Sequence, residues 1–134
     1  MAAEWTIEAR TYGIDLTGDE YDELWEIYDA RDIAQYFTEE VVAVARDSDG
    51  DIIGGITESG VDELTIGVNE GWQGYGIGTA MIKALIAEGG GGFMVAGTDA
   101  GSEFLWGLYE QLTEAEREEL DVPSWESREE EDAT

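Results

Sequence analysis

Apolar residues recur along the chain with two different periods, one typical of helices and one typical of strands. Near the start, Thr17 and Glu20 form a T-x-x-E capping box, and apolar residues follow at positions 21, 24, 25 and 28. This i, i+3, i+4, i+7 spacing marks one face of a helix and predicts an amphipathic helix. A short strand near residues 5–12 should precede it, and a second short helical segment is expected around residues 33–37.

The middle of the chain has the pattern of an antiparallel meander. Two β-type runs, Val41 to Ala45 and Ile52 to Thr57, flank the sequence DSDGD, in which Asp49-Gly50 is typical of a hairpin turn. A third run, Val61 to Val68, follows. These runs predict three strands joined by short turns.

The next part of the chain predicts two helices and a strand. A helix from Gly76 to Glu88 presents apolar residues on one face, and the glycine run 89–92 is expected to end it. A strand is expected around Phe93 to Ala96. Ser102 is expected to cap a further helix that continues to Leu112.

The last part of the chain is strongly acidic. Residues 113–116 repeat the capping-box pattern and predict a short acidic helix, which Pro123 should end. Residues 124–134 have the composition of a solvated tail. At this length we expect one domain, over residues 1–121, followed by an acidic tail over residues 122–134.

The net charge is the most unusual global property of the chain. Its 134 residues include 33 Asp and Glu but only 6 Lys and Arg, so the formal net charge is −27, and 43% of the residues are hydrophobic. Self-repulsion disfavours a compact state in dilute buffer, whereas in molar salt the Debye length is only ~3 Å. We therefore expect a protein of a halophile's salt-rich cytoplasm. The aromatic content argues against disorder, although nucleic-acid mimicry by a folded acidic surface stays open.

The residue types present exclude several functional classes. The chain has no cysteine and no histidine, which removes disulfides, thiolate nucleophiles, Ser-His triads and zinc fingers. Without a basic stripe, direct nucleic-acid binding is not expected. No signal-like segment or long apolar run suggests a membrane. The turn DSDGD suggests a calcium loop, but its glycine stands at position four instead of six, so an acidic turn is favoured and no metal site is expected.

The strongest functional signal is WQGYGIGT, residues 72–79. It follows a β-type run and opens a helix, so backbone amides can converge on an anion there. A Walker loop is excluded, because Ile77 follows Gly76 and the nearest lysine, Lys83, lies inside the helix. A dinucleotide fingerprint fits poorly, because the preceding strands look hairpin-connected.

Residues 73–78, Gln-x-x-Gly-x-Gly, resemble the pyrophosphate-binding pattern of the GNAT superfamily of N-acetyltransferases. LTIGV at residues 64–68 is similar to that family's fourth strand, and GLYEQL at residues 107–112 is similar to its LYEKLGF region. The resemblance covers roughly residues 5–112. It implies an α/β (α+β) fold with a central mixed, mostly antiparallel sheet flanked by helices, here without the family's usual last strands.

The resemblance also implies acetyl-CoA as co-substrate. Main-chain groups of Ile66 and Gly67 would hold the pantetheine arm, and the Val68 N–H would polarise the acetyl carbonyl. A glycine inside a strand marks a bulge or a close backbone approach, so Gly67 favours a local splay. The expected pyrophosphate ligands are Gln73, Gly74, Gly76, Gly78 and Thr79.

Acid and base groups follow from the same resemblance. Tyr109 lies where the family often places its general acid, and a packed aromatic residue on an amphipathic helix is an equal alternative. Glu63 is the expected base, with Asp62 and Glu58 as alternatives. The resemblance also places the first helices beside the acceptor cleft. Their aromatic residues either line this cleft or belong to the core, and they are Tyr28, Tyr36 and Phe37.

The predicted function is therefore acetyl transfer from acetyl-CoA directly to a primary amine of a small molecule or peptide. An acidic surface would favour a cationic acceptor. The alternative is a catalytically inactive GNAT-like module that serves as a structural or interaction subunit of a halophilic assembly, cellular or viral. Either function is compatible with a homo-oligomer or a larger assembly.

Overall fold

A four-stranded antiparallel sheet in the order β1-β2-β3-β4 forms the centre of the molecule. The computed structural model describes residues 4–59, 63–94, 99–123 and 125. Its elements are β1 (Trp5–Ala9), α1 (Gly18–Ala30), the 3-10 helix η1 (Ala34–Tyr36), β2 (Val41–Asp47), β3 (Ile52–Glu58), β4 (Leu64–Val68), the 3-10 helix η2 (Glu70–Trp72), α2 (Ile77–Ala87), β5 (Gly92–Phe93), α3 (Asp99–Gln111), α4 (Glu114–Glu118) and β6 (Leu120–Asp121). The predicted meander is confirmed, with Gly50 in the β2–β3 turn at a φ of +87°.

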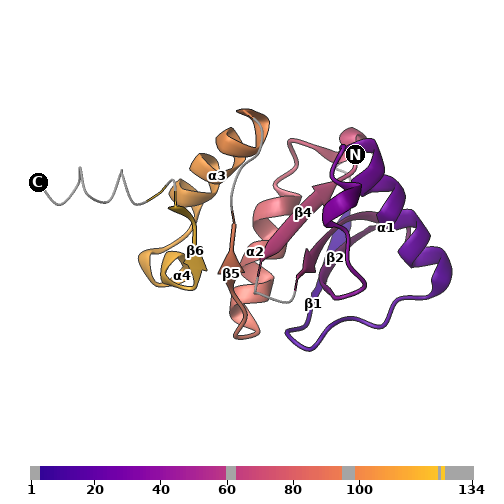
Figure 1. The fold of residues 1–134 in the computed structure, drawn as a ribbon, viewed down its shortest axis with the longest axis horizontal. Coiled ribbons are helices and arrows are strands. Elements are labelled where there is room, and N and C mark those ends of the chain that lie inside the picture. Colours follow the sequence, from indigo (N-terminus) through magenta and orange to yellow (C-terminus); the bar gives the residue numbers. More distant parts are fainter. Residues whose placement is uncertain (1–3, 60–62, 95–98, 124, 126–134) are drawn as a thin grey trace, which may run out of the picture.

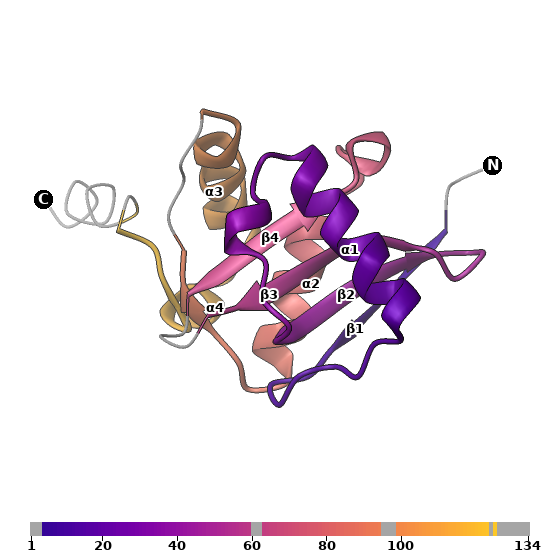
Figure 2. The same cartoon turned by 45° about the vertical axis from the view of Figure 1, so that its right-hand side comes forward.

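Helices cover both faces of this sheet. α1 packs on β3 and β4 on one face, and α2 packs across all four strands on the other (Figure 2). The sheet therefore separates two apolar cores. The residues of α1 in the first core are Leu24, Ile27 and Tyr28, and those of α2 in the second are Ile77, Met81, Ile82 and Leu85.

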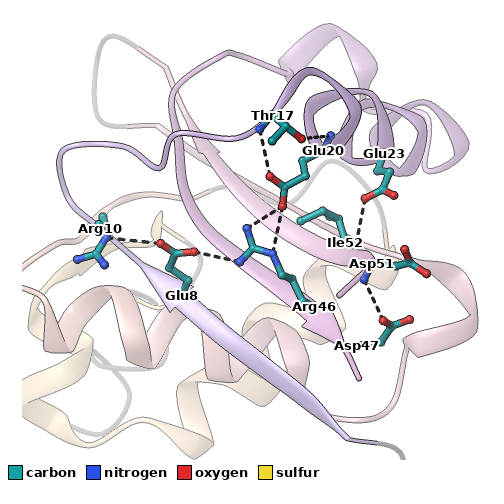
Figure 3. Close-up of polar contacts among 9 residues, drawn as sticks. All are labelled: Glu8, Arg10, Thr17, Glu20, Glu23, Arg46, Asp47, Asp51 and Ile52. Atoms are coloured by element: carbon teal, nitrogen blue, oxygen red, sulfur yellow. Dashed lines mark hydrogen bonds and ion pairs between the residues drawn. The ribbon is translucent and has the colours of Figure 1, made fainter. Parts of the chain in front are cut away.

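A single arginine joins the edge of the sheet to the start of α1. Arg46 on β2 contacts Glu8 on β1 through Nη1 at 3.0 Å and Glu20 on α1 through Nη2 at 2.9 Å (Figure 3). Glu20 also accepts from Thr17 N at 3.1 Å, and Thr17 Oγ1 accepts from Glu20 N at 3.2 Å, so the predicted capping box is confirmed. The Thr17 N–H and then the Arg46 guanidinium lower the pKa of Glu20 from its ordinary value of 4.5.

The C-terminal elements lie together beside the sheet. β5 and β6 pair in parallel, and α3 and α4 lie next to them (Figure 1). The glycine run after α2 ends that helix in a Schellman motif, because Gly90 N donates to Leu85 O and Gly89 N donates to Ile86 O, both at 2.9 Å. Residues 95 and 96 of the expected strand lie outside the described residues.

Two expectations for this region are wrong. α3 begins at Asp99, so Ser102 lies in the first turn of the helix and is not its N-cap. α4 ends at Glu118, before Pro123 is reached. The second capping box is confirmed, since Thr113 Oγ1 accepts from Glu116 N at 3.1 Å.

Packed residues are found beyond residue 121, within the expected acidic tail of residues 122–134. Val122 and Trp125 are only 4% and 3% exposed. Trp125 Nε1 donates to Leu105 O at 3.0 Å, which ties this segment to α3. Val122 and Trp125 therefore belong to the second core.

The architecture as a whole is a mixed α/β fold whose antiparallel sheet is flanked by helices, as the sequence predicts. None of the described helices combines the length and the apolar character that crossing a bilayer would require.

Candidate functional site

The glycine loop connects the end of β4 to the start of α2. Gly74 and Gly76 have φ angles of +87° and +79°, a left-handed conformation that glycine adopts without strain. At both positions, no atom of the described chain lies within 4 Å of the place where a Cβ would stand. Any other residue would strain the backbone and project into the open space beside the loop.

The first turn of α2 supplies main-chain donors to this loop. The helix begins at Ile77, and its N-cap Gly76 offers no side-chain cap. The first intrahelical bond runs from Ala80 N to Gly76 O at 3.0 Å. The N–H groups of residues 77–79 therefore have no acceptor within the helix, and they form the positive end of its dipole. Two predicted ligands lie here, and any contact from Gly78 or the buried Thr79 would come from the main chain.

Gly78 also has a packing role. A Cβ at this position would stand 2.8 Å from Cε2 of Phe104 on α3. This is closer than carbon atoms can approach, so a side chain here would force the Phe104 ring out of its place against α2. Gly78 therefore serves the contact between the two helices.

The first residue of the motif, Gln73, faces an arginine that the sequence did not assign to the site. With the amide oriented to satisfy both groups, Gln73 Oε1 lies 2.9 Å from Arg31 Nη1, 2.9 Å from Nη2 and 3.2 Å from Nε. Arg31 is the C-cap of α1. No motif connects it with the loop, and its rarity as one of 6 basic residues is the only sequence signal that singles it out.

The pairing of β4 with β3 determines which of its main-chain groups face outward. Asn69 N donates to Ile53 O at 2.8 Å, and Ser59 N donates to Glu63 O at 2.9 Å. The register between these two points has no shift. Hydrogen-bonded and non-hydrogen-bonded pairs alternate along antiparallel strands. The main-chain N–H and C=O groups of the odd-numbered residues of β4 therefore face β3, and those of residues 64, 66 and 68 face the opposite edge.

The N–H and C=O groups of Ile66 and Val68 thus lie on the edge of β4 that faces away from β3. In the part of the chain that the structure describes, this edge carries one bridge, between Glu63 and Phe93 at the start of β4. β5 itself pairs with β6, and Figure 1 shows β4 and β5 as strands inclined to each other. The main-chain groups of Gly67 face β3, unlike the role expected for them.

Gly67 makes room for Tyr28. A Cβ at Gly67 would stand 2.7 Å from Cδ1 and Cε1 of that ring, and the β3–β4 register is regular there, so the glycine marks a close approach and not a bulge. The Tyr28 hydroxyl donates to Thr65 O and accepts from Thr57 N and Thr57 Oγ1, both at 3.2 Å. β4 is therefore fixed from the α1 side of the sheet.

Glu63 and Val68 lie at opposite ends of β4. A strand rises about 3.3 Å per residue, so their main chains are separated by roughly 16 Å. Glu63 therefore does not reach an acetyl group held at Val68 directly. Of the alternative bases, Glu58 ends β3, and Asp62 lies outside the described residues.

Tyr109 is held in a cluster of rings on α3 and is 8% exposed. Arg117 Cζ lies 4.2 Å from the centroid of its ring, and the Trp125 and Trp106 rings lie 5.3 and 6.1 Å away. Arg117 Nη1 also donates to Tyr109 O at 2.9 Å. These contacts are those of a packed core residue, and they also hold the ring in a defined position.

The three aromatic residues expected at the acceptor cleft differ in exposure. Tyr28 is fully buried and belongs to the core, whereas Tyr36 is 50% exposed. Phe37 packs edge-on against Tyr28, with 5.3 Å between the ring centroids. Only Tyr36 of this set presents a large surface to an acceptor.

The acidic turn between β2 and β3 brings Asp47, Asp49 and Asp51 together, with one carboxylate oxygen of each within 4.8 Å of the others. Asp47 Oδ1 accepts from the N–H groups of Asp49 and Asp51, both at 3.0 Å. These bonds form the turn itself and account for the positions of the aspartates.

Comparison with protein families places these features in a wider group. A model of the acetyltransferase (GNAT) family matches residues 10–113, which is more than half of the chain. The matched range contains β4, the glycine loop and α2, and it ends at Thr113, the N-cap of α4. No curated protein and no solved structure matches the chain.

Proposed function

This chain belongs to the acetyltransferase (GNAT) family, and on that premise we propose that it transfers an acetyl group from acetyl-CoA directly to a primary amine of a small molecule or peptide. The family acts on amine acceptors and generally uses acetyl-CoA. The chain carries a net charge of −27, which favours a cationic acceptor through long-range attraction.

The proposed coenzyme site extends from the glycine loop along the outward edge of β4. The diphosphate would lie against the N–H groups of residues 76–79, beside the open space at Gly74 and Gly76. The pantetheine amides would pair with the main chain of Ile66, and the Val68 N–H would bind the acetyl oxygen. Gly67 would contribute indirectly, because its lack of a side chain leaves room for the Tyr28 ring against β4.

The proposed reaction is a direct transfer. The amine nitrogen attacks the thioester carbon, and the negative charge that develops on the carbonyl oxygen is stabilised by the Val68 N–H. The C–S bond then breaks, the thiolate of coenzyme A takes the proton of the Tyr109 hydroxyl, and the second proton that the nitrogen loses as the amide forms restores this hydroxyl through solvent. Glu63 would accept the proton of the incoming ammonium through water, since it lies roughly 16 Å from Val68 along β4.

The observation that carries this proposal is a strand with outward-facing main-chain groups that leads into a loop with two positive-φ glycines at a helix N-terminus. Calorimetry with acetyl-CoA in molar salt tests it. Gly76→Asp should abolish binding, because it adds a side chain and a negative charge at the diphosphate position.

The hairpin turn offers a matched control for this variant. Gly50 has a φ of +87° and, like Gly76, no described atom within 4 Å of its Cβ position. Gly50→Asp therefore imposes similar strain and the same charge change far from the loop along the chain, and it should bind acetyl-CoA like the wild type. Equal losses in both variants, or no binding by the wild type at millimolar coenzyme, would contradict the proposed function.

A catalytically inactive module is the second candidate function. The specific observation in its favour is that the family match ends at Thr113, and the residues beyond it that the structure describes contribute one strand, the two-residue β6, besides the short helix α4. A chain that binds acetyl-CoA but releases no thiol with any amine in a broad screen would support a structural or interaction subunit of a larger assembly.

We also propose that the protein works in a salt-rich cytoplasm. At a net charge of −27, cooperative folding should require roughly molar KCl, where the Debye length falls to ~3 Å. Circular dichroism across a salt titration measures this. A full native signal with cooperative melting at about 50 mM salt, where screening is weak, would contradict it.

A further inference from the structure

Arg31 stands out among the cations of the described chain because of what surrounds it. Arg10, Arg46 and Lys83 each pair with a carboxylate, and Arg117 lies over a tyrosine ring. No described carboxylate lies within ion-pair distance of Arg31, whose partner is the neutral amide of Gln73. In a chain with 33 acidic residues, an arginine with no acidic partner among the described residues is unusual.

The donors of Arg31 exceed what Gln73 can use. A guanidinium has five N–H groups, whereas an amide oxygen has two lone pairs. Even if Nε, Nη1 and Nη2 each direct one N–H group at Gln73, two donors remain for another acceptor. The guanidinium is exposed and lies next to Gln73, the residue directly before Gly74, so those donors are within a side-chain length of the glycine loop.

The backbone fixes Arg31 in this place through an uncommon conformation. Asp32 has a φ of +62° and is the only non-glycine residue of the described chain with a positive φ. It ends α1 in a Schellman motif, because Ile33 N donates to Tyr28 O at 2.9 Å and Asp32 N donates to Asp29 O at 3.1 Å. This helix end fixes the backbone at Arg31, from which the side chain reaches Gln73.

We propose that Arg31 and the glycine loop together bind the diphosphate of the coenzyme. Arg31 would then supply, from the end of α1, a positive charge that the neutral side chain of Gln73 lacks. This inference rests on the proposed coenzyme site. A planar guanidinium matches two phosphate oxygens at once. Gln73 orients the guanidinium by accepting from it, and the main-chain donors of the loop bind the remaining oxygens.

The test is calorimetry with coenzyme A in about 1 M KCl, where direct contacts persist although longer-range attraction is screened. Arg31→Gln should raise Kd about 10-fold or more, as expected for a lost charge-assisted contact. Arg10→Gln removes the same charge beside β1, where Arg10 pairs with Glu8 at 3.5 Å, and should leave Kd unchanged. Melting temperatures should not differ between the two variants.

Two further measurements separate a diphosphate contact from other roles. 3′-Dephospho-coenzyme A retains the diphosphate, so Arg31→Gln should weaken its binding by the same factor as for coenzyme A. In the double variant Arg31→Gln/Gln73→Arg, the charge returns from the loop itself, and most of the affinity should return with it. A merely structural role of Arg31 predicts neither result.

The outcomes distinguish this inference from the proposed function. If the wild type binds coenzyme A and Arg31→Gln binds equally well, the role of Arg31 is overturned and the coenzyme site stands. If the loss disappears with 3′-dephospho-coenzyme A, Arg31 contacts the ribose phosphate, and the diphosphate assignment is wrong. If the wild type binds neither ligand, the proposed function fails, and the role of Arg31 fails with it.

Discussion

Tyr28 and Tyr109 lie in separate cores on opposite faces of the sheet, and the structure holds them by different parts of the side chain. The Tyr28 hydroxyl bonds to Thr57 and Thr65 on adjacent strands. Tyr109 is held through its ring, by Arg117 on one face and by Trp125 at 5.3 Å. Both are buried tyrosines of amphipathic helices, and the Tyr28 hydroxyl is bonded to the main chain of two strands of the sheet.

The bonds of the Tyr28 hydroxyl argue against a part for this residue in proton transfer. Burial raises the pKa of Tyr28 above its ordinary value, and its proton is donated to a main-chain carbonyl of β4. Moving that proton would break the contact that fixes β4. The role of Tyr28 is therefore structural, and the proposal of a general acid falls on Tyr109.

The largest expected effect is that of Tyr109→Phe. If Tyr109 is the proposed general acid, the variant should lose on the order of 10²- to 10⁴-fold in turnover while coenzyme affinity stays unchanged. The measurement is thiol release from acetyl-CoA with an amine found by screening. Trp106→Phe changes a neighbouring ring of the same cluster and is the control. Equal turnover in the wild type and in Tyr109→Phe would remove Tyr109 from the mechanism.

Tyr28→Phe should have the opposite signature. The variant keeps the ring but removes the hydroxyl, which leaves buried groups of Thr57 and Thr65 with fewer partners and should lower the free energy of unfolding by roughly 1–3 kcal/mol. Denaturant unfolding in molar salt measures this. Tyr21→Phe on the same helix is the control, because Tyr21 makes a solvent-exposed bond to Glu39 O at 3.2 Å. Similar stability of the two variants would contradict the role assigned to Tyr28.

How far the sequence predicts these features depends on the range of the contacts. The capping boxes at Thr17 and Thr113 are local, so the residue types and their spacing were sufficient. The glycine loop was likewise visible as a motif between a strand and a helix. The start of α3 was placed too late, because Ser102 is a good capping residue in isolation, whereas the helix begins at Asp99.

Contacts between distant segments could not be read in this way. Nothing in the spacing places Arg31 against Gln73 or Tyr28 beneath Gly67, since both contacts depend on how α1 crosses the sheet. The acidic composition near the C-terminus predicts an acidic tail from residue 122 that is solvated from residue 124, but Val122 and Trp125 are buried. A few apolar residues within an acidic segment are enough to pack it once a core with space for them exists.

Trp125→Phe tests the ring contacts that hold Tyr109 and should have a smaller effect. The variant removes the Nε1 donor to Leu105 O, a bond of 3.0 Å, and reduces the ring that packs on Tyr109. The expected loss is about 1–2 kcal/mol of unfolding free energy. If the ring contacts position Tyr109 for catalysis, turnover should also fall while the KM for acetyl-CoA stays the same. A loss of stability with unchanged turnover would show that Trp125 has only a packing role.

The smallest expected effect is a pH dependence on the Tyr28 side of the molecule. The pKa of Glu20 is lowered by the Thr17 N–H and by Arg46. Its carboxylate therefore stabilises the fold at pH values above 4.5, the ordinary pKa of a glutamate. This stabilisation is lost as the pH falls below that value, through the lowered folded-state pKa, because the folded state then has to take up a proton that the unfolded state already binds. In molar salt the ion pair between Glu20 and Arg46 contributes less than about 1 kcal/mol.

Melting temperatures between pH 7 and pH 3 should show a shallower decline in Glu20→Gln than in the wild type. Glu26→Gln, which removes an exposed carboxylate of the same helix, controls for the lost charge. Identical pH profiles for Glu20→Gln and the wild type would show that the contacts of Glu20 with Thr17 and Arg46 do not stabilise α1.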